Sequence, residues 1–506
     1  MLFLLVLLSS ALGAWVREPP VPEVRTRSQP VDGWVTVRLN HFDASNTETF
    51  QMRYYYNNEF ATTNNIVIFV GGEWAISPGW VTGGLAHELA QKTGAGLFYT
   101  EHRYYGQTRP TNGTSVAELR FLTVDQALAD LAQFIQYVQS DYFDSGRFRG
   151  GKVSLVGCSY AGSMATWMRL AYPHLVTAAF SDSGPLHAQE DFPEYLEVIA
   201  EALRVQGSHH CVESIAESVQ KVHQELKTEA GAARISRLFN TCSPINGSDP
   251  LDVATFFWFG VTETFAYLVQ YATPGDIATA CAVLTDVNVS DPSERLANWI
   301  TQQSWTQPCI QASYAAQVAA HTNTSYDAQQ AVMRLWTYQT CVEYGWYQTT
   351  NGEEHPFLST VPLSYFHRMC RDFFGDNFDE NFLRQGIKRT NLLFGGLTFM
   401  PDGVVSRRRA RPLVAGGHDP WSPMGPNATH ATPLAPVYVA SQVSHCRAIR
   451  STKDSETEQL EVIKQSVLRN MQEFLAGKPP TTPDSSAAIL TPVLFTLIVT
   501  FVSLVL

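Results

Sequence analysis

The first third of the chain alternates short apolar runs with amphipathic segments, as the strands and helices of an α/β domain do. Two segments alternate apolar and polar positions, which predicts half-buried antiparallel strands: residues 34–42 and 49–57. Four nearly continuous apolar runs are typical of buried parallel strands: residues 66–70, 96–100, 153–156 and 176–180. Helical periodicity appears between them, at residues 85–92 and 124–138. This order predicts an α/β core with a mostly parallel sheet.

The pattern changes between residues 192 and 384, where helical periodicity dominates. Helices are predicted at residues 194–205, 212–228, 274–284 and 328–338. Six of the eight cysteines fall in this region: Cys211, Cys242, Cys281, Cys309, Cys341 and Cys370. Six cysteines allow fifteen pairings, among which the sequence alone does not choose. We predict a helical, disulfide-stapled cap at residues 192–384, inserted between core segments 31–191 and 385–475.

The α/β pattern returns after the predicted cap. Apolar runs predict further core segments at residues 392–396, 412–421 and 437–443. Residues 456–474 then show the periodicity of a final amphipathic helix.

A serine stands where the predicted strand at residues 153–156 passes into a helical pattern. The sequence there is Gly157-Cys158-Ser159-Tyr160-Ala161-Gly162. This is the layout of a nucleophile elbow, in which a serine occupies a sharp turn between strand and helix. The five-residue pattern Gly-x-Ser-x-Gly is not met, because Ala161 takes the place of its last glycine. The alternative is an ordinary turn of small residues.

A serine nucleophile needs a base to take its proton and an acid to orient that base. In α/β-hydrolases these groups follow in the order serine, acid, histidine. Asp419 follows one predicted strand and His445 follows the next, so both stand at strand ends. Taken alone, Asp419 is typical of an ordinary Asp-Pro turn, and His445 is typical of a surface or core histidine. Together, in this order, they favour a triad of Ser159, Asp419 and His445.

Other residues compete for these roles. Asp182 follows an earlier strand and is an alternative acid, whereas His418 should point away from its neighbour Asp419. His430 precedes a strand, which places it poorly for a base. For the oxyanion hole we expect the backbone N–H of Tyr160 and one from the glycine pair that ends at Gly72.

Composition limits the classes of function. The chain is 45% hydrophobic and 16% charged, which fits a globular protein, and its net charge of -12 gives no basic surface for nucleic acid. No cysteine pair has the Cys-x-x-Cys spacing of a zinc site. The predicted chemistry needs no cofactor.

Both ends of the chain are apolar. Residues 1–15 are typical of a secretory signal peptide, and residues 489–506 form an uncharged tail after a linker at 476–488. Because no basic residues follow this tail, the pattern favours a GPI signal over a membrane-spanning tail. Scattered cysteines and glycosylation sequons support a secretory-pathway protein that is extracellular, cell-surface or lysosomal. The sequons are Asn112, Asn246, Asn288, Asn323 and Asn427.

Several motifs together resemble one family of serine peptidases. They are GGEW at residues 71–74, EHRYYG at 101–106, the elbow, YQTC at 338–341, HDPW at 418–421 and SHC at 444–446. The family contains lysosomal Pro-Xaa carboxypeptidase, dipeptidyl peptidase II and thymus-specific serine protease, and the chain looks most similar to the last branch. The resemblance spans residues 34–474. It implies an α/β-hydrolase core with a helical cap, and an exopeptidase that acts on short or proline-containing peptides with Ser159, Asp419 and His445.

The resemblance also implies a disulfide pattern. It pairs Cys211 with Cys281, Cys242 with Cys309, and Cys341 with Cys370, which leaves Cys158 and Cys446 unpaired. Three residues depart from the family: Cys158 and Trp74 replace glycines, and Ala415 replaces an asparagine.

These departures keep open a catalytically silent binding protein, while a lipase or esterase is disfavoured by the peptidase-like motifs. Peptides are the expected partners, and a homodimer and a membrane attachment stay open.

A run of basic residues, Arg407-Arg408-Arg409-Ala410-Arg411, precedes the predicted strand of the acid. We expect a solvated loop there, and a processing site of the secretory pathway is the alternative.

Overall fold

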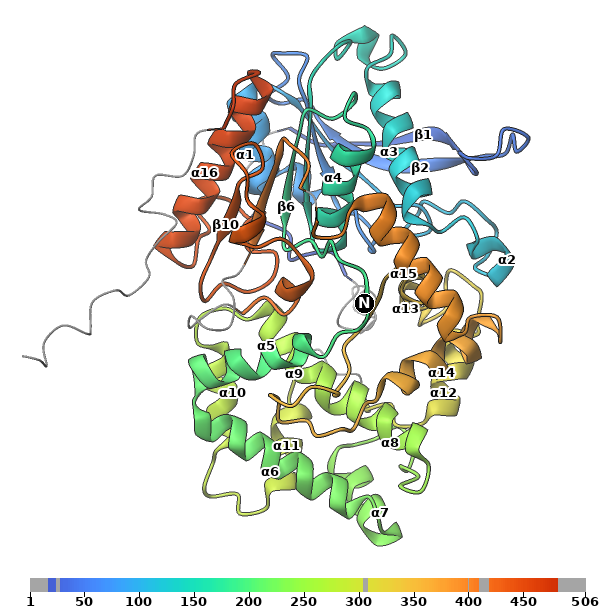
Figure 1. Cartoon of the computed structure of the whole chain (residues 1–506), viewed down its shortest axis with the longest axis vertical. Coiled ribbons are helices and arrows are strands. Elements are labelled where there is room, and N and C mark those ends of the chain that lie inside the picture. The colour runs from blue at the N-terminus through green and yellow to red at the C-terminus, as the bar shows by residue number, and fades with distance from the viewer. Residues whose placement is uncertain (1–16, 24–27, 304–307, 399, 409–417, 481–506) are drawn as a thin grey trace, which may run out of the picture.

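The structure is a computed structural model that describes residues 17–23, 28–303, 308–398, 400–408 and 418–480. A twisted sheet with its helices occupies one half of the molecule, and a group of further helices occupies the other (Figure 1). The predicted signal peptide, the C-terminal tail and Ala415 lie outside the described residues. Among the described helices, none is long and apolar enough to cross a membrane.

Eight strands of the described chain form the main sheet, in the order β1-β2-β4-β3-β5-β6-β9-β10. The edge strands β1 and β2 run antiparallel, and the strands from β4 onward are parallel to one another. The bounds are β1 (Val31–Arg38), β2 (Thr49–Asn57), β3 (Ile66–Val70), β4 (Gly96–Thr100), β5 (Val153–Cys158), β6 (Ala178–Asp182), β9 (Val404–Arg408) and β10 (Val437–Val439). The apolar pattern predicted antiparallel strands followed by a mostly parallel sheet, and both predictions are confirmed.

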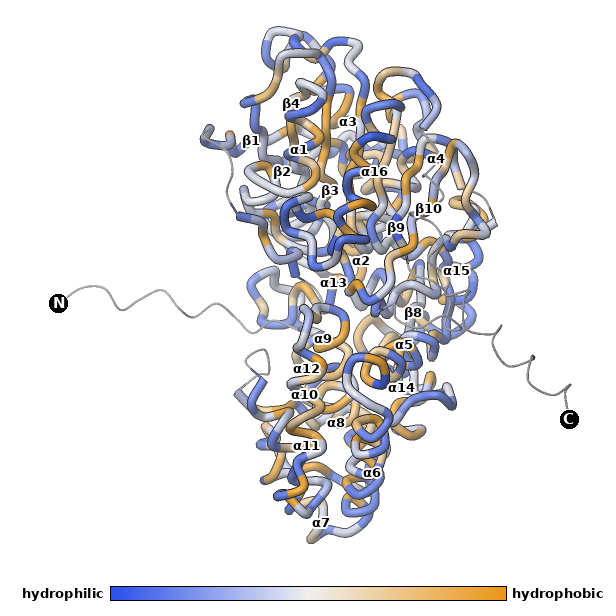
Figure 2. Tube along the Cα trace, turned by 90° about the vertical axis from the view of Figure 1, so that its left-hand side faces the viewer, coloured by the Kyte–Doolittle hydropathy of each residue, from blue (hydrophilic) through white to orange (hydrophobic). Residues whose placement is uncertain are grey.

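Helices cover both faces of the sheet, which explains why β3, β4, β5 and β6 are buried along their whole length. Helices α1 and α16 pack together on one side, and α3 and α4 pack together on the other (Figure 1). Figure 2 shows hydrophobic positions running through the sheet and hydrophilic ones on the outside of the molecule. The bounds are α1 (Gly84–Thr93), α2 (Val116–Leu119), α3 (Val124–Val138), α4 (Tyr160–Ala171) and α16 (Glu458–Leu475).

The second half is the predicted helical insertion. Disulfides join Cys211 to Cys281, Cys242 to Cys309, and Cys341 to Cys370, the pairs that the family resemblance implies. A short parallel pair, β7 (Gln189–Asp191) and β8 (Gly345–Tyr347), lies where the two halves meet. The helices are α5 (Glu194–Ala202), α6 (His209–Glu225), α7 (Glu229–Leu238), α8 (Pro250–Phe256), α9 (Glu263–Tyr271), α10 (Asp276–Leu284), α11 (Pro292–Ile300), α12 (Tyr314–His321), α13 (Ala331–Gln339), α14 (Leu363–Phe374) and α15 (Glu380–Phe394).

The return from the cap to the core differs from the prediction. Residues 392–394, expected in a core strand, form the last turn of α15, and Gly395 ends that helix in a left-handed conformation. The predicted cap boundary at residue 384 therefore falls inside a helix. The next core strand is β9, and the predicted strand at 437–443 shortens to β10. Periodicity could not separate a short apolar strand from the apolar end of a helix.

The basic run begins inside the protein, where we expected a solvated loop. Arg407 is buried in β9 beside its strand neighbour Asp182 on β6, and the two side chains form an ion pair. The Arg407 guanidinium also donates to Ser183 Oγ at 2.8 Å. Residues 409–411 lie outside the described residues, so processing there stays a prediction.

Replacing Arg407 by methionine should destabilise the protein by about 3 kcal/mol or more, because it leaves the buried Asp182 carboxylate without its cation. Thermal and denaturant unfolding would measure this. The matched control is Arg384→Met, which removes an exposed pair with Glu190 and should cost less than about 1 kcal/mol. If both variants lost the same free energy of unfolding, a structural role for Arg407 would be contradicted.

Candidate active site

Ser159 occupies the turn between β5 and α4. Its backbone angles, φ 56° and ψ -134°, lie outside the regions that side-chain-bearing residues normally adopt. Two glycines make this turn possible. A Cβ on Gly157 would lie 2.2 Å from the carbonyl oxygen of Ala161, and one on Gly162 would lie 3.0 Å from Ser181 Oγ. The close approach of α4 to β6 therefore falls at Gly162, which explains why Ala161 is tolerated one position earlier.

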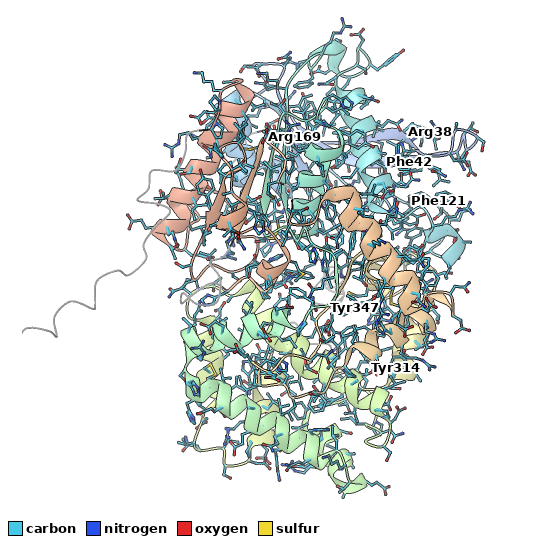
Figure 3. The ribbon with its side chains drawn as sticks, in the orientation of Figure 1. Arg38, Phe42, Phe121, Arg169, Tyr314 and Tyr347 are labelled. Atoms are coloured by element: carbon cyan, nitrogen blue, oxygen red, sulfur yellow. A yellow bond between two sulfur atoms is a disulfide. The ribbon has the colours of Figure 1, made fainter. Side chains whose placement is uncertain are left out.

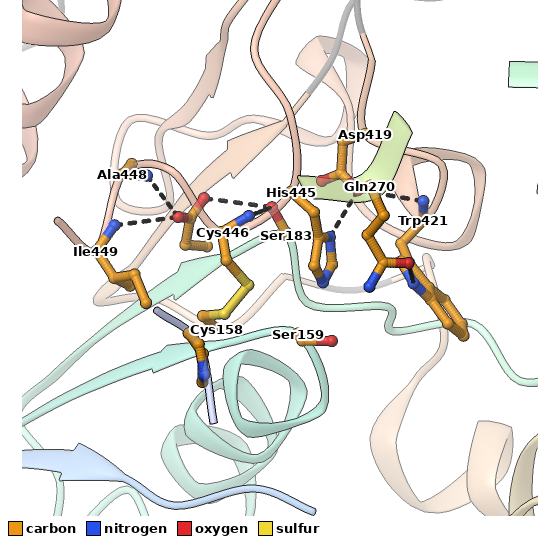
Figure 4. The surroundings of a disulfide bond; sticks show 12 residues. Cys158, Ser159, Ser183, Gln270, Asp419, Trp421, His445, Cys446, Ala448 and Ile449 are labelled. Carbon is orange, nitrogen blue, oxygen red and sulfur yellow. Dashed lines mark hydrogen bonds and ion pairs between the residues drawn. A yellow bond between two sulfur atoms is a disulfide. The ribbon is translucent and has the colours of Figure 1, made fainter. Parts of the chain in front are cut away.

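His445 and Asp419 form a buried pair. The Nδ1 of His445 lies 2.7 Å from Oδ1 of Asp419. Although burial opposes ionisation, the attraction of His445 and its hydrogen bond hold the pKa of Asp419 below its ordinary value. The other ring nitrogen, Nε2, is buried and has no hydrogen-bond partner among the described residues. In Figure 4 the ring stands between Asp419 and Ser159.

The cap holds the loop that carries His445. The Oγ of Ser444 donates to the carbonyl oxygen of Gln270 at 2.6 Å, and the N–H of His445 donates to the same oxygen at 3.1 Å. The side chain of Gln270 accepts from Trp421 Nε1 at 3.0 Å and from the Tyr195 hydroxyl at 2.7 Å. Sequence reasoning missed Gln270, because only the fold brings α9 to this loop.

Cys158 and Cys446 form a disulfide, so the expectation that they are unpaired was wrong. The bond joins the residue before Ser159 to the residue after His445 (Figure 4). The two Cα atoms are 5.6 Å apart. A signal for this bond was present in the sequence: if Ser159 and His445 act together, their neighbouring cysteines must also be close. The family resemblance concealed it, because the usual residue at position 158 is glycine.

The residues expected at the oxyanion hole lie at the ends of two neighbouring strands. Tyr160 begins α4, so its backbone N–H is one of those that a helix leaves without an internal partner. Gly72 follows β3, which pairs with β5. A Cβ on Gly72 would lie 2.7 Å from the ring of Trp74, whose Nε1 donates to the Tyr99 hydroxyl at 2.7 Å. Trp74, one of the departures from the family, thus packs against the Gly72 backbone.

The competing residues have other roles. Asp182 is paired with Arg407 and accepts from the N–H groups of Ala448 and Ile449 at 2.7 and 3.1 Å. The ring of His418 contacts Gln206, with a nitrogen–nitrogen distance of 2.6 Å. The Nδ1 of His430 accepts from the backbone N–H of Asn427. The three side chains are thus bound by residues other than Ser159.

A cavity lies between the core and the cap, and Ser159 is part of its wall. Aromatic rings form much of the lining, from Trp258, Trp336, Trp346, Tyr347 and Trp421. Figure 3 shows Tyr347 near the middle of the molecule, where the halves meet. Among the described residues, no group of three or more histidine, cysteine or acidic side chains could hold a metal ion.

The five sequon asparagines lie at the surface to different degrees. Asn112, Asn246, Asn288 and Asn323 are exposed, and Asn427 is partly exposed at the start of a short helical turn. The geometry is compatible with glycosylation at the first four.

Comparison with known proteins identifies the family. Residues 37–467 match the model of the serine carboxypeptidase S28 family. The chain belongs to this family. It is 30% identical to mouse thymus-specific serine protease over 463 residues, which cover 88% of each chain. It is 26% identical to human lysosomal Pro-X carboxypeptidase over 426 residues, 81% of each chain.

Among solved structures, a proline iminopeptidase from Mycobacterium smegmatis aligns over 88% of this chain and 99% of its own, with 12% identity and a TM-score of 0.35. The fold is assigned from the sheet order and the cap, and this distant likeness has no part in the assignment. As a member of the S28 family, the protein is a serine-type peptidase with an α/β-hydrolase core.

Removing the disulfide beside Ser159 should lower the activity by more than the loss of folded protein accounts for. In Cys158→Ala/Cys446→Ala the elbow and the histidine loop lose their covalent link, and we expect kcat to fall about 10-fold or more. Peptidase assays at a temperature where the variant is folded would measure this. The control is Cys242→Ala/Cys309→Ala, whose cysteines do not line the cavity. Equal kcat values for the two variants would contradict a role in positioning.

The pKa shifts of four buried groups predict how the stability of the folded protein depends on pH. Burial raises the pKa of Glu73 and of Glu343 from 4.5 to about 8, and it lowers the pKa of His102 and of His321 from 6.5 to about 4. Between pH 4.5 and 6.5 the folded state holds two carboxyl protons and the unfolded state two imidazole protons, so stability is flat. Below pH 4.5 the unfolded state binds more protons, and stability falls as the pH falls. Above pH 6.5 the folded state binds more protons than the unfolded state, so stability falls as the pH rises to about 8.

Thermal unfolding between pH 5 and 8 would test this expectation. The midpoint should decrease from pH 6.5 to 8, and Glu343→Gln should remove about half of the decrease, since an amide resembles the protonated acid. Glu353→Gln, on the surface, serves as the control. A midpoint that rises over this range would contradict the prediction.

Proposed function

We propose that this peptidase is an exopeptidase that cleaves short peptides through an acyl-enzyme on Ser159. The Oγ of Ser159 attacks the scissile carbonyl carbon while His445 Nε2 takes its proton. The C–N bond then breaks, and His445 gives the proton to the departing amine. Water, activated by the same imidazole, releases the acyl group as a carboxylate. Asp419 orients the ring and stabilises the imidazolium, and the N–H groups of Tyr160 and Gly72 donate hydrogen bonds to the oxyanion.

The observation that carries the proposal is the His445 ring. Its Nδ1 is bound by Asp419, and its buried Nε2 has no protein partner among the described residues. A buried ring nitrogen without a partner is costly unless a reacting group supplies one. Ser159 stands in the strained turn that exposes a nucleophile in this fold. The two features support a base and a nucleophile that act together.

The exopeptidase mode is supported by the place of Ser159. The cavity lies under the cap, so a chain end or a short peptide can enter but a folded protein cannot thread through. The aromatic lining offers apolar, ring-shaped surfaces, which suit a proline side chain. A preference for proline also agrees with the name of one relative, lysosomal Pro-X carboxypeptidase.

The same proposal includes export of the chain. We infer a signal peptide at residues 1–15, a GPI signal at 489–506 and glycosylation at the sequons. Four disulfides in the described chain and the lysosomal name of a relative support a secretory or lysosomal location.

A catalytically silent binding protein is the second candidate, and it rests on the departures from the family. Two of them have structural roles that leave the site intact. Cys158 is in a disulfide, and Trp74 packs against Gly72. These roles favour an active enzyme.

Labelling with a fluorophosphonate probe would test the nucleophile. The wild-type protein should react, and Ser159→Ala should lose essentially all labelling, because the probe requires a serine activated by its base. Ser163→Ala, one helical turn further along α4, is the control and should still label. Labelling of Ser159→Ala equal to wild type would overturn the assignment of Ser159, and an unreactive wild type would favour the binding protein.

A further inference from the structure

The amino-terminal segment of the described chain, residues 17–23, packs against the loop between β3 and α1. The Nε1 of Trp80 donates to the carbonyl oxygen of Pro19 at 3.3 Å. A Cβ on Gly83 would lie 2.5 Å from the carbonyl oxygen of Glu23, so glycine there permits the close approach of the two backbones. The segment is therefore an integral part of the core.

Glu18 is the residue of this segment that binds groups in the interior. Its Oε1 accepts a hydrogen bond from the backbone N–H of Ser77 at 3.0 Å and another from the Tyr99 hydroxyl at 3.0 Å. Ser77 belongs to the loop after β3, and Tyr99 is fully buried in β4. The carboxyl group thus joins the amino-terminal segment to that loop and to a central strand.

The hydrogen bonds from Trp74 to Tyr99 and from Tyr99 to Glu18 run in one direction. The Nε1 of Trp74 donates to the Tyr99 hydroxyl at 2.7 Å. Since an indole nitrogen can only donate, the hydroxyl oxygen is the acceptor, and the proton of the same hydroxyl is left for Glu18. Trp74 and Tyr99 are both buried, so water does not replace these partners. The carboxyl group therefore orients the hydroxyl, and the hydroxyl orients the indole.

Trp74 connects these hydrogen bonds to the expected oxyanion hole. A Cβ on Gly72 would lie 2.7 Å from the indole ring, so the ring packs directly on the Gly72 backbone. The N–H of Gly72 is one of the two donors that we place at the oxyanion. A displaced indole would leave this N–H free to turn away. Because position 74 is one of the departures from the family, this support of the loop is a feature of this chain.

Arg17 connects the same segment to the cap. Its guanidinium lies 4.9 Å from the ring centre of Tyr267 on α9, and its Nη2 donates to the hydroxyl of that residue. Helix α9 also contains Gln270, whose carbonyl oxygen accepts from the N–H of His445. Two consecutive residues, Arg17 and Glu18, thus contact the helix that holds the base and the loop that contains an oxyanion donor.

We propose that Glu18 is a positioning residue for the oxyanion hole. It acts through Tyr99 and Trp74, whose ring holds the backbone of Gly72. The proposal rests on the function proposed above, with Ser159 as the nucleophile. Glu18 does not line the cavity, so it does not contact the substrate. Loss of its carboxyl group leaves the Tyr99 hydroxyl without an acceptor, which loosens the indole and weakens the stabilisation of the oxyanion.

The kinetics of labelling with a fluorophosphonate probe would test the inference. When Ser159 Oγ attacks the phosphorus, the P–F bond breaks, fluoride leaves and His445 takes the serine proton. Negative charge develops on the phosphoryl oxygen, which uses the same N–H donors as the oxyanion of a peptide. In Glu18→Ala we expect the maximal rate of labelling to fall about 10-fold, while the probe concentration for half of that rate changes less than about 2-fold.

Two further variants of the same segment serve as a rescue and a control. Glu18→Gln keeps an oxygen that accepts both hydrogen bonds, so its rate should stay within about 3-fold of the wild type. Glu23→Ala removes an exposed carboxyl group and should label like the wild type. All rates are compared at a temperature at which circular dichroism shows every variant to be folded.

A double-mutant cycle tests the route through the indole. Trp74→Phe keeps an aromatic ring but removes the N–H that Tyr99 accepts. In that background Glu18→Ala should change the rate less than about 2-fold, because the connection is already broken. An equal fall in both backgrounds would overturn this route.

The outcomes separate the inference from the function on which it rests. A folded Glu18→Ala that labels as fast as a reactive wild type would overturn the positioning role and leave Ser159 as the nucleophile. A wild type that does not react would overturn the proposed function, and the role of Glu18 with it.

Discussion

Asp182 connects the parts of the molecule on which the candidate site depends. Its backbone carbonyl accepts the N–H of Ser159 at 3.0 Å, which ties the end of β6 to the elbow. Its carboxylate pairs with Arg407 on β9 and accepts the N–H groups of Ala448 and Ile449, just beyond His445. One buried acid thus joins the turn at Ser159, the strand β9 and the loop that carries His445. Because a buried charge needs all of its partners, these three segments have little freedom to separate.

The disulfide between Cys158 and Cys446 adds a covalent link between the same segments. The ion pair joins β6 to β9 at the level of Cys158, and the disulfide joins the two residues beside Ser159 and His445. A strained turn such as that at Ser159 persists only where its surroundings hold it. The two links together explain how this chain keeps that turn although Cys158 and Ala161 replace residues of the usual pattern.

The cap does more than cover the site. Through Gln270 it holds Ser444, His445 and Trp421, so the position of His445 depends on helix α9 as well as on the sheet. The cap also provides most of the aromatic lining of the cavity and Glu263, one of its two acids. The geometry around His445 and the lining of the cavity therefore both depend on the folded cap.

Local sequence determined much of this protein. Apolar runs predicted β3, β4 and β5 closely, because a strand buried on both faces must be apolar throughout. The spacing of small residues identified the elbow, and the order of Ser159, Asp419 and His445 along the chain indicated a triad. The family motifs implied the three disulfides of the cap. All of these features depend on neighbours in the chain or on a pattern that relatives share.

Tertiary structure decided the rest. Arg407 was expected in a solvated basic loop, and only the pairing of β9 with β6 shows that it neutralises Asp182. Cys158 and Cys446 are 288 residues apart, and Gln270 is a cap residue beside a core loop. No local periodicity reports such contacts, because they arise when distant segments meet across a sheet end. The same holds for Glu73, a core residue that lines the cavity between core and cap.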